Sequence, residues 1–196
     1  MSSDSPSPLS IEEYRALRAT IRERGTARWI VIALTFVAWA WIVSTTQAPL
    51  SAPFPTPLSS LIPLVVLAAG FEIVFGLHVG VERVGRYLQA RYEAADGSLP
   101  QWEHEAMAAG SVPELRSGID PLAGWLFIAA AAVNLMRFGT PIMLIDVGLP
   151  GSTWLELAVS LALHSLFVVR LSRARRFAAT QRDEDLRFFG RTRRGA

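Results

Sequence analysis

The stretch WIVIALTFVAWAWIVSTT, residues 29–46, contains no charged side chain. A helix rises 1.5 Å per residue, so about 20 apolar residues cross the ~30 Å hydrocarbon core of a bilayer. Three further apolar runs of comparable length follow, at about 58–81, 122–138 and 154–169. The sequence therefore predicts an all-α polytopic membrane protein, with a bundle of four transmembrane helices over residues 29–170 and amphipathic cytoplasmic helices at both ends.

All nineteen basic residues are arginine, and they are unevenly distributed around these runs. Five precede the first run, four lie between the second and third, and nine follow the fourth, whereas the other two connections hold none. Because basic residues accumulate on the cytoplasmic side, this pattern predicts that both termini and the 82–120 segment are cytoplasmic. Arg137, at the outer end of the third run, is expected to snorkel or to meet Asp146. Arginine in place of lysine suggests a GC-rich genome, and hence a bacterial inner membrane.

The segments outside the bundle have readable local structure. Residues 1–10 lack the order of a cleavable signal and are expected to form a disordered leader. Ser10 and Glu13 form a capping box that opens an amphipathic helix over residues 11–25, which Gly25 is expected to end. The apolar stripe of that helix could lie on lipid headgroups or pack on another cytoplasmic helix.

The other cytoplasmic segments are also expected to be helical. The second run continues to about Glu93, where turn residues follow, and residues 101–109 suggest a short helix. Residues 171–196 are predicted to form a basic C-terminal helix and tail. Four arginines at its start, Arg170, Arg173, Arg175 and Arg176, are expected to contact anionic lipid headgroups.

Several classes of function are disfavoured. The chain has no cysteine and no glycine-rich phosphate-binding loop, which argues against thiol chemistry and nucleotide binding. Its extramembrane segments are too short for a separate catalytic domain, so a non-enzymatic role is favoured. Nucleic-acid binding is not expected either, because the arginines beside the apolar runs are explained by topology alone.

Three polar residues inside the apolar runs are candidates for function: Glu72, Asn134 and Glu156. An ionisable group in a membrane helix is costly and usually faces the bundle interior or a wet cavity. Glu72 could therefore handle a proton or ion, or could simply hydrogen-bond a neighbouring helix through Asn134. Residues 69, 72, 75, 76, 79, 80 and 83 are predicted to face protein, with 66, 67, 73, 74, 77 and 81 facing lipid. Gly76 and Gly80 have the small-xxx-small spacing that permits close helix packing.

His78 and His164 are predicted to lie at one depth, since each precedes an arginine by five or six residues. Two imidazoles on parallel, diagonal helices could ligate a haem iron, an architecture that resembles b-type cytochrome bundles. A metal site is the related alternative, with His78, Glu82 and His164 as ligands and the stripe of Glu156 and Ser160 beside them. His104 could add a third imidazole. Against both hypotheses stands the plainer one that the histidines only hydrogen-bond within the bundle.

These observations favour a small integral inner-membrane protein that acts as an accessory or interaction subunit. The expected partners are a bilayer with anionic headgroups and either another protein or further copies of this chain. The alternatives are a haem b- or divalent-metal-binding protein using His78 and His164, and a proton- or ion-coupled carrier centred on Glu72.

Overall fold

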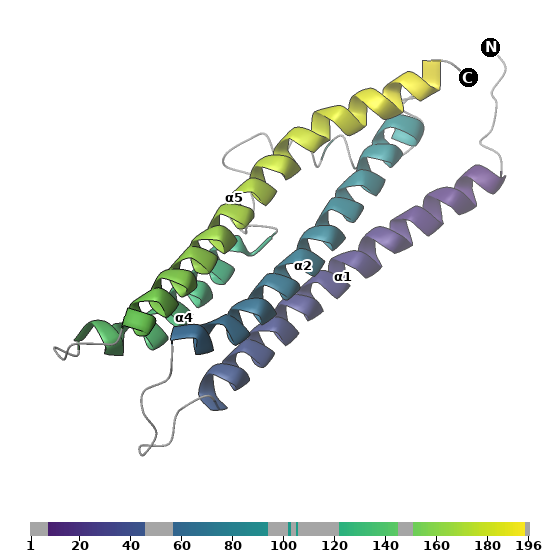
Figure 1. Cartoon of the computed structure of the whole chain (residues 1–196). Helices are drawn as coiled ribbons and strands as arrows, with labels where there is room; N and C mark the ends of the chain where they lie inside the picture. The colour runs from purple at the N-terminus through teal and green to yellow at the C-terminus, as the bar shows by residue number, and fades with distance from the viewer. Residues whose placement is uncertain are drawn as a thin grey trace, which may run out of the picture. The chain divides into compact units, whose positions relative to one another are not determined.

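The computed structural model describes residues 8–45, 57–93, 102, 105, 122–144 and 151–194, and the regular structure in these ranges is entirely helical (Figure 1). The elements are α1 (Pro8–Thr45), the 3-10 turn η1 (Pro57–Ser60), α2 (Leu61–Leu88), the π-helical turn η2 (Gln89–Glu93), α4 (Gly124–Leu144) and α5 (Gly151–Arg194). The all-α prediction is confirmed. The predicted short helix at 101–109 and His104 lie outside the described residues, except Trp102 and Glu105.

Three helical stretches are long and apolar enough to cross a membrane: Ile11–Thr45, Pro57–Glu93 and Gly151–Phe189. The third predicted run corresponds to α4, whose described apolar part, Gly124–Arg137, is shorter. Helix α4 begins after Ala123, which has a left-handed backbone with φ of 48° and whose carbonyl accepts the Leu126 amide at 2.9 Å. The composition of the apolar runs thus specifies helices, with α4 as the shortest of the four.

Helix α1 is continuous, so the prediction that a helix ends at Gly25 is wrong. An interior glycine costs a helix only about 1 kcal/mol, and no proline or turn residue follows Gly25 to end the hydrogen-bond ladder. The helix also begins at Pro8, inside the predicted 1–10 leader, because proline is tolerated in the first helical turn. Residues 1–7 lie outside the described ranges. The predicted continuations are confirmed, since α2 with η2 extends to Glu93 and α5 extends to Arg194.

The chain divides into two compact units. We call Trp29–Phe75 with Asp120–Arg175 the apolar unit, and Met1–Arg28 with Gly76–Ile119 and Arg176–Ala196 the charged unit. The apolar unit contains the four predicted apolar runs apart from the end of the second. Helices α1, α2 and α5 contribute to both units, so each of these helices is apolar over one part of its length and strongly charged over another.

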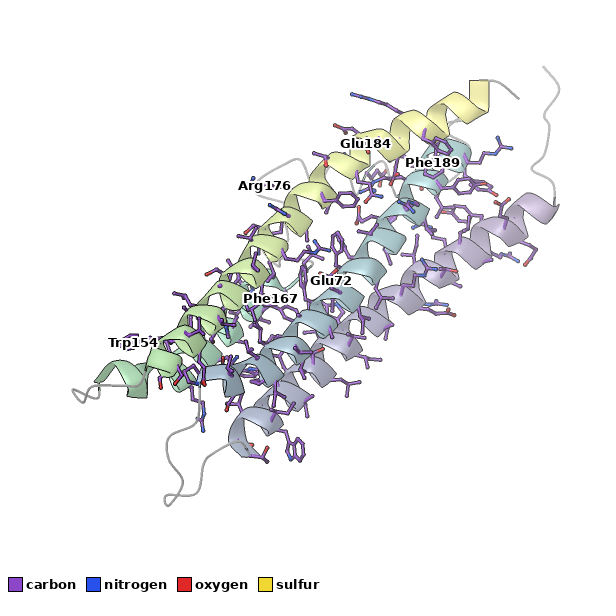
Figure 2. The ribbon with its side chains drawn as sticks, viewed as in Figure 1. Glu72, Trp154, Phe167, Arg176, Glu184 and Phe189 are labelled. Atoms are coloured by element: carbon purple, nitrogen blue, oxygen red, sulfur yellow. The ribbon has the colours of Figure 1, made fainter. Side chains whose placement is uncertain are left out.

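The apolar unit has one hydrophobic core to which all four helices contribute. Phe71 of α2 is fully buried, and its ring lies 5.5 Å from that of Phe127 on α4 and 6.2 Å from that of Phe167 on α5, which Figure 2 labels. Phe36 of α1 approaches Phe127 at 5.1 Å. Edge-to-face and tilted aromatic pairs of this kind add about 0.5–1.5 kcal/mol each beyond their buried area.

A small residue lets α1 and α2 come together in the apolar unit. A Cβ atom added to Gly70 would overlap the side chain of Thr35 on α1, which is itself buried. The Thr35 hydroxyl donates to the Val31 carbonyl one turn earlier at 2.7 Å, so it needs no partner on α2. Gly70 is therefore the position at which a backbone hydrogen allows close packing.

Candidate functional site

The apolar unit contains a buried cluster of four polar side chains, Ser60, Asn134, Ser160 and His164, each at most 3% exposed. The Asn134 Nδ2 group lies 2.7 Å from the Ser60 carbonyl oxygen and 3.0 Å from the His164 Nε2 atom. The two serine hydroxyls are 2.7 Å apart, and the His164 Nδ1 atom is 2.8 Å from the Ser160 carbonyl oxygen. The cluster joins η1, immediately before α2, to α4 and α5.

Elementary donor and acceptor rules give each hydrogen bond in this cluster a direction. Ser60 donates its hydroxyl hydrogen to the Pro57 carbonyl at 2.7 Å, so the Ser160 hydroxyl must donate to Ser60. The two hydrogens of the Asn134 amide go to the Ser60 carbonyl and to His164 Nε2. His164 is therefore neutral and carries its hydrogen on Nδ1, from which it donates to the Ser160 carbonyl. Both of its ring nitrogens are engaged, and within this cluster only the buried Asn134 Oδ1 atom lacks a partner among the described residues.

Glu72 forms an ion pair with Arg170 of α5, whose Nη2 atom lies 2.7 Å from Glu72 Oε2. The guanidinium also lies over the Phe75 ring at 4.9 Å, a cation–π arrangement. Both charged side chains remain about half exposed, 48% for Glu72 and 40% for Arg170. Glu72 (labelled in Figure 2) therefore pairs with an arginine, and Asn134, suggested as one possible partner of Glu72, instead contacts Ser60 and His164.

The predicted faces of α2 are wrong at several positions, although Ile73 is exposed as predicted. Leu67 and Val74, expected to face lipid, are fully buried in the core, whereas Ala69, Glu72 and Gly76, expected to face protein, are exposed. The prediction assumed that the only carboxylate in the run must point inward. The buried face of α2 instead packs its bulky apolar side chains against the neighbouring helices, while the carboxylate obtains its countercharge from Arg170 on a neighbouring helix.

Two contacts fix the direction of α2 and α5 within the apolar unit. Ser60 meets Ser160 at one level and Glu72 meets Arg170 at another. Glu72 follows Ser60 by twelve residues (72 − 60) and Arg170 follows Ser160 by ten (170 − 160), or about 18 Å and about 15 Å of helix. The two segments therefore run parallel, as predicted.

Arg170 is consequently level with Glu72, which lies inside the second predicted apolar run. Arg170 was also expected to bind lipid headgroups, whereas its guanidinium binds Glu72. The other three arginines of that group, Arg173, Arg175 and Arg176, have exposed side chains. Glu156, near the start of α5, is partly exposed.

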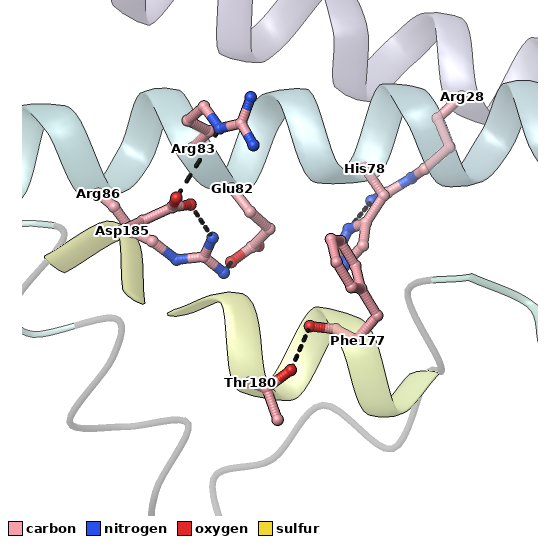
Figure 3. A network of polar contacts seen from close by, with 8 residues as sticks. All are labelled: Arg28, His78, Glu82, Arg83, Arg86, Phe177, Thr180 and Asp185. Carbon is pink, nitrogen blue, oxygen red and sulfur yellow. Dashed lines mark hydrogen bonds and ion pairs between the residues drawn. The ribbon is translucent and has the colours of Figure 1, made fainter. Parts of the chain in front are cut away.

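His78 belongs to the charged unit and accepts a hydrogen bond from Arg28 of α1, whose Nη1 atom lies 3.2 Å from His78 Nδ1 (Figure 3). Arginine only donates, so Nδ1 carries no hydrogen and His78 is neutral in this contact. The Phe177 side chain of α5 points toward the imidazole in the same view. His78 and His164 thus have different partners, and Glu82 turns to Arg86, not to His78.

Arg86 organises an ion network in the charged unit, also visible in Figure 3. Its buried guanidinium, 5% exposed, lies 2.8 Å from Asp185 of α5 and 3.2 Å from Glu82 one turn earlier on α2. Arg83 approaches the other Asp185 oxygen at 3.9 Å but is 56% exposed. Asp185 therefore joins α5 to α2 through one buried and one exposed arginine.

Helix α1 joins the charged unit through tyrosines and a second ion pair. The Tyr87 hydroxyl donates to Glu13 at 2.9 Å, and Arg18 lies 3.5 Å from the buried Glu93. The rings of Tyr14 and Tyr92 meet edge to face at 5.6 Å. Hydrogen bonds from Tyr92 and then Tyr87 hold the pKa of Glu13 below its ordinary value.

The two glycines predicted to pack against a helix differ in their surroundings. A Cβ on Gly80 would approach the Arg24 Nη1 atom of α1 to 2.5 Å, so a side chain from α1 covers that position. A Cβ on Gly76 would meet nothing within 4 Å. Of these two glycines, only Gly80 has a neighbour on another helix among the described residues.

The metal and haem hypotheses gain no support from this geometry. No group of three or more His, Asp or Glu residues able to hold a metal ion occurs among the residues that the structure describes. A haem ligand needs an imidazole nitrogen for the iron, and both nitrogens of His164 are already hydrogen-bonded within the chain.

Sequence reasoning placed Ser160 and His164 on one stripe of the fourth run but did not connect Asn134 to them, and it missed Ser60 and Asp185. The spacing of Ser160 and His164, one helical turn apart, was the available signal for the buried cluster. For Asp185 the only signal in the sequence was its position in an acidic triplet among arginines. No protein-family model matches this chain, and neither a curated protein nor a solved structure shows significant similarity to it.

Proposed function

We propose that this protein is an integral inner-membrane interaction subunit, whose apolar unit spans the bilayer and whose charged unit is a cytoplasmic docking surface. The observation that carries the proposal is the division of single unbroken helices. Helices α1, α2 and α5 are each apolar and outwardly hydrophobic in one unit, and charged and linked by ion pairs in the other.

The surface of the apolar unit supports the first half of the proposal. Large apolar side chains are exposed on every helix, a composition that water would penalise and hydrocarbon would solvate. The most exposed of them, each 57–67% accessible, are Leu34, Val37, Trp41, Ile62, Val65, Trp125, Met136, Leu155 and Leu166. Burial of one side of each helix with exposure of the other is the pattern of a membrane bundle.

The charged unit supports the second half. Its segments of α1, α2 and α5 are joined through Arg86–Asp185, Tyr87–Glu13 and Arg18–Glu93, which makes a defined surface out of highly charged helices. Two large apolar side chains of α5 remain exposed there, Phe177 at 49% and Phe188 at 64%. Exposed aromatic residues rimmed by arginine are typical of protein–protein contact surfaces.

The two alternatives have weaker support. Haem or metal binding would have to break the hydrogen bonds of His164 to Asn134 and Ser160. A proton- or ion-coupled carrier would need Glu72 to exchange its ligand, whereas a guanidinium at 2.7 Å already neutralises this carboxylate. A structural or interaction role requires neither change.

Membrane insertion and topology can be tested with single cysteines, because the chain has none. Ser152 and Thr180 are exposed positions in the apolar and charged units, respectively. In intact cells, Ser152→Cys should react with a membrane-impermeant thiol reagent and Thr180→Cys only after permeabilisation, while both chains resist alkaline carbonate extraction. Extraction by carbonate, or the reverse labelling pattern, would refute the proposal.

The docking role can be tested with a photo-crosslinking amino acid at Phe188. One protein partner should be captured in cells reproducibly and with a defined mass, and the charge variant Arg187→Glu beside it should reduce the yield. The same probe at Leu34 on the lipid-facing surface is the matched control and should capture no such partner. Equal capture at both positions would contradict a docking surface on α5.

A further inference from the structure

The Glu72–Arg170 pair stands on an outward face of the apolar unit, not in its core. Its neighbours on α2 are the exposed Val65, Ala69 and Ile73, and on α5 the exposed Leu166 and Val169. An ionised group within a membrane helix costs about 2.5–3.5 kcal/mol on insertion scales. Two half-exposed charges on a surface proposed to face hydrocarbon therefore require a second polar surface opposite them.

The contact within the chain uses only part of the hydrogen-bonding capacity of the pair. Arg170 contributes Nη2 and Glu72 contributes Oε2, while a guanidinium has five donor hydrogens and a carboxylate two oxygen acceptors. Acyl chains can neither accept nor donate hydrogen bonds. A partner that fits this surface must present a cation and an anion next to each other, at the height of the Glu72–Arg170 pair along the helices.

We infer that the partner is a second copy of this chain, packed face to face through α2 and α5. A surface that carries one positive and one negative group side by side is self-complementary across a two-fold axis. The axis places Glu72 of each copy against Arg170 of the other, which gives a ring of four alternating charges. Ala69, one turn before Glu72, is the small residue that allows the two α2 helices to approach.

The interface explains why an ion pair is present on the outside of an apolar unit at all. Within one chain the pair is removed from water, while its remaining donor and acceptor groups face acyl chains that form no hydrogen bonds. Between two copies each guanidinium lies between two carboxylates and is shielded from lipid by Val65, Ile73 and Leu166. The inference rests on the proposed membrane insertion, and it names one partner of the apolar unit.

A test that separates contacts within a chain from contacts between chains uses two charge variants. Glu72→Arg carries two positive groups and Arg170→Glu two negative groups, so each variant breaks the pair within its own chain. Each variant alone should fail to dimerise. A mixture should dimerise, because the two variants complement each other only across an interface. The double variant Glu72→Arg with Arg170→Glu should dimerise alone.

Dimerisation is read from bis-maleimide crosslinking of Ala69→Cys chains reconstituted in vesicles of neutral lipid at low protein density. The crosslinked fraction of the mixture should exceed that of either variant alone by roughly fivefold, the size typical of a polar contact between membrane helices. Leu34→Cys, on the exposed side of α1, is the control position and should crosslink only at the random-collision level.

The outcomes separate the inference from the function on which it rests. A mixture that crosslinks no more than its components, or wild-type Ala69→Cys chains that match the Leu34→Cys control, overturns the dimer. If those chains still resist carbonate extraction, membrane insertion stands without it. A heterologous product of different mass at Ala69→Cys in cells, with no homodimer, identifies another protein as the occupant and also overturns the inference.

Discussion

The two units of this protein use opposite means to hold the same helices. In the apolar unit α1, α2, α4 and α5 share a core around Phe71, and four buried polar side chains are gathered into one small cluster at Asn134. In the charged unit the segments of α1, α2 and α5 are joined by ion pairs and tyrosine contacts, and Arg86 is itself buried. The same three helices are therefore held by apolar packing in one unit and by ion pairs and tyrosine contacts in the other.

The largest expected effect is loss of the aromatic core. Phe71→Ala removes a fully buried ring that meets Phe127 and Phe167, and should destabilise the apolar unit by about 3–5 kcal/mol. Leu34→Ala, at a residue 62% exposed, is the control and should change stability by less than about 1 kcal/mol. Reversible unfolding in detergent measures both, and equal changes would mean that Phe71 is not in the core.

The charged unit should depend most on Arg86. Arg86→Met leaves Asp185 and Glu82 without their shared cation and should cost about 1.5–3 kcal/mol, seen as faster amide exchange in the Arg176–Arg194 part of α5. Arg83→Met is the matched control, because Arg83 is mostly exposed and 3.9 Å from Asp185. Its effect should be at most about 1 kcal/mol and should vanish in high salt. A larger destabilisation by Arg83→Met than by Arg86→Met would refute the network.

The buried cluster of the apolar unit should contribute less. Asn134→Ala removes the donor to the Ser60 carbonyl and to His164 Nε2, and should destabilise by about 1–2 kcal/mol. Met136→Ala, two residues later and 57% exposed, is the control and should be close to neutral. Indistinguishable unfolding midpoints for the two variants would show that Asn134 does not form the hydrogen bonds that the distances indicate.

A stabilising change is expected in the charged unit at Gly25. A Cβ added there meets nothing within 4 Å, so Gly25→Ala should gain about 0.5–1 kcal/mol by favouring the continuous α1 helix. Gly80→Ala would push against the Arg24 side chain and should gain less. If Gly25→Ala instead lowered helicity or stability, α1 would break at that residue as the sequence pattern suggested.

The smallest effect concerns pH and Glu13. The hydrogen-bonded carboxylate has a lowered pKa, so its contribution is present above its unfolded-state pKa and is lost as pH falls through the lower folded-state value. Amide exchange in the first turns of α1 should accelerate modestly below about pH 4. Glu13→Gln should abolish this response, and Glu12→Gln, at a residue paired only with Arg15 on the surface, should retain it. A response that survives in Glu13→Gln would assign it to another group.

The success of sequence-based prediction differed between elements for a physical reason. The continuations of α2 to Glu93 and of α5 to Arg194 were predictable because helical periodicity and the absence of turn residues are local properties. Which face of α2 is buried was not predictable, because the rotation of a helix about its axis is decided by the elements that pack against it. Leu67 and Val74 are buried in the core. Glu72 remains exposed because Arg170, about a hundred residues later in the chain, supplies its countercharge.

The candidate residues were found but wrongly paired. Asn134 was suggested as one possible partner of Glu72, and His164 was placed level with His78 by an estimate of depth. Depth depends on which residues are level across helices, and the Ser60–Ser160 and Glu72–Arg170 contacts set that register. A single sequence contains no information about register between helices joined by long connections.

What the sequence by itself determined is the list of helices, their apolar and charged portions, and the uneven distribution of arginine, because composition and periodicity act within each segment. Only the tertiary structure decided which polar groups meet. It brought Asn134 to His164, Arg28 to His78, Arg86 to Asp185 and Arg170 to Glu72. Each of these contacts depends on helix rotation and register, which are set when the bulky side chains of several helices fill one core together.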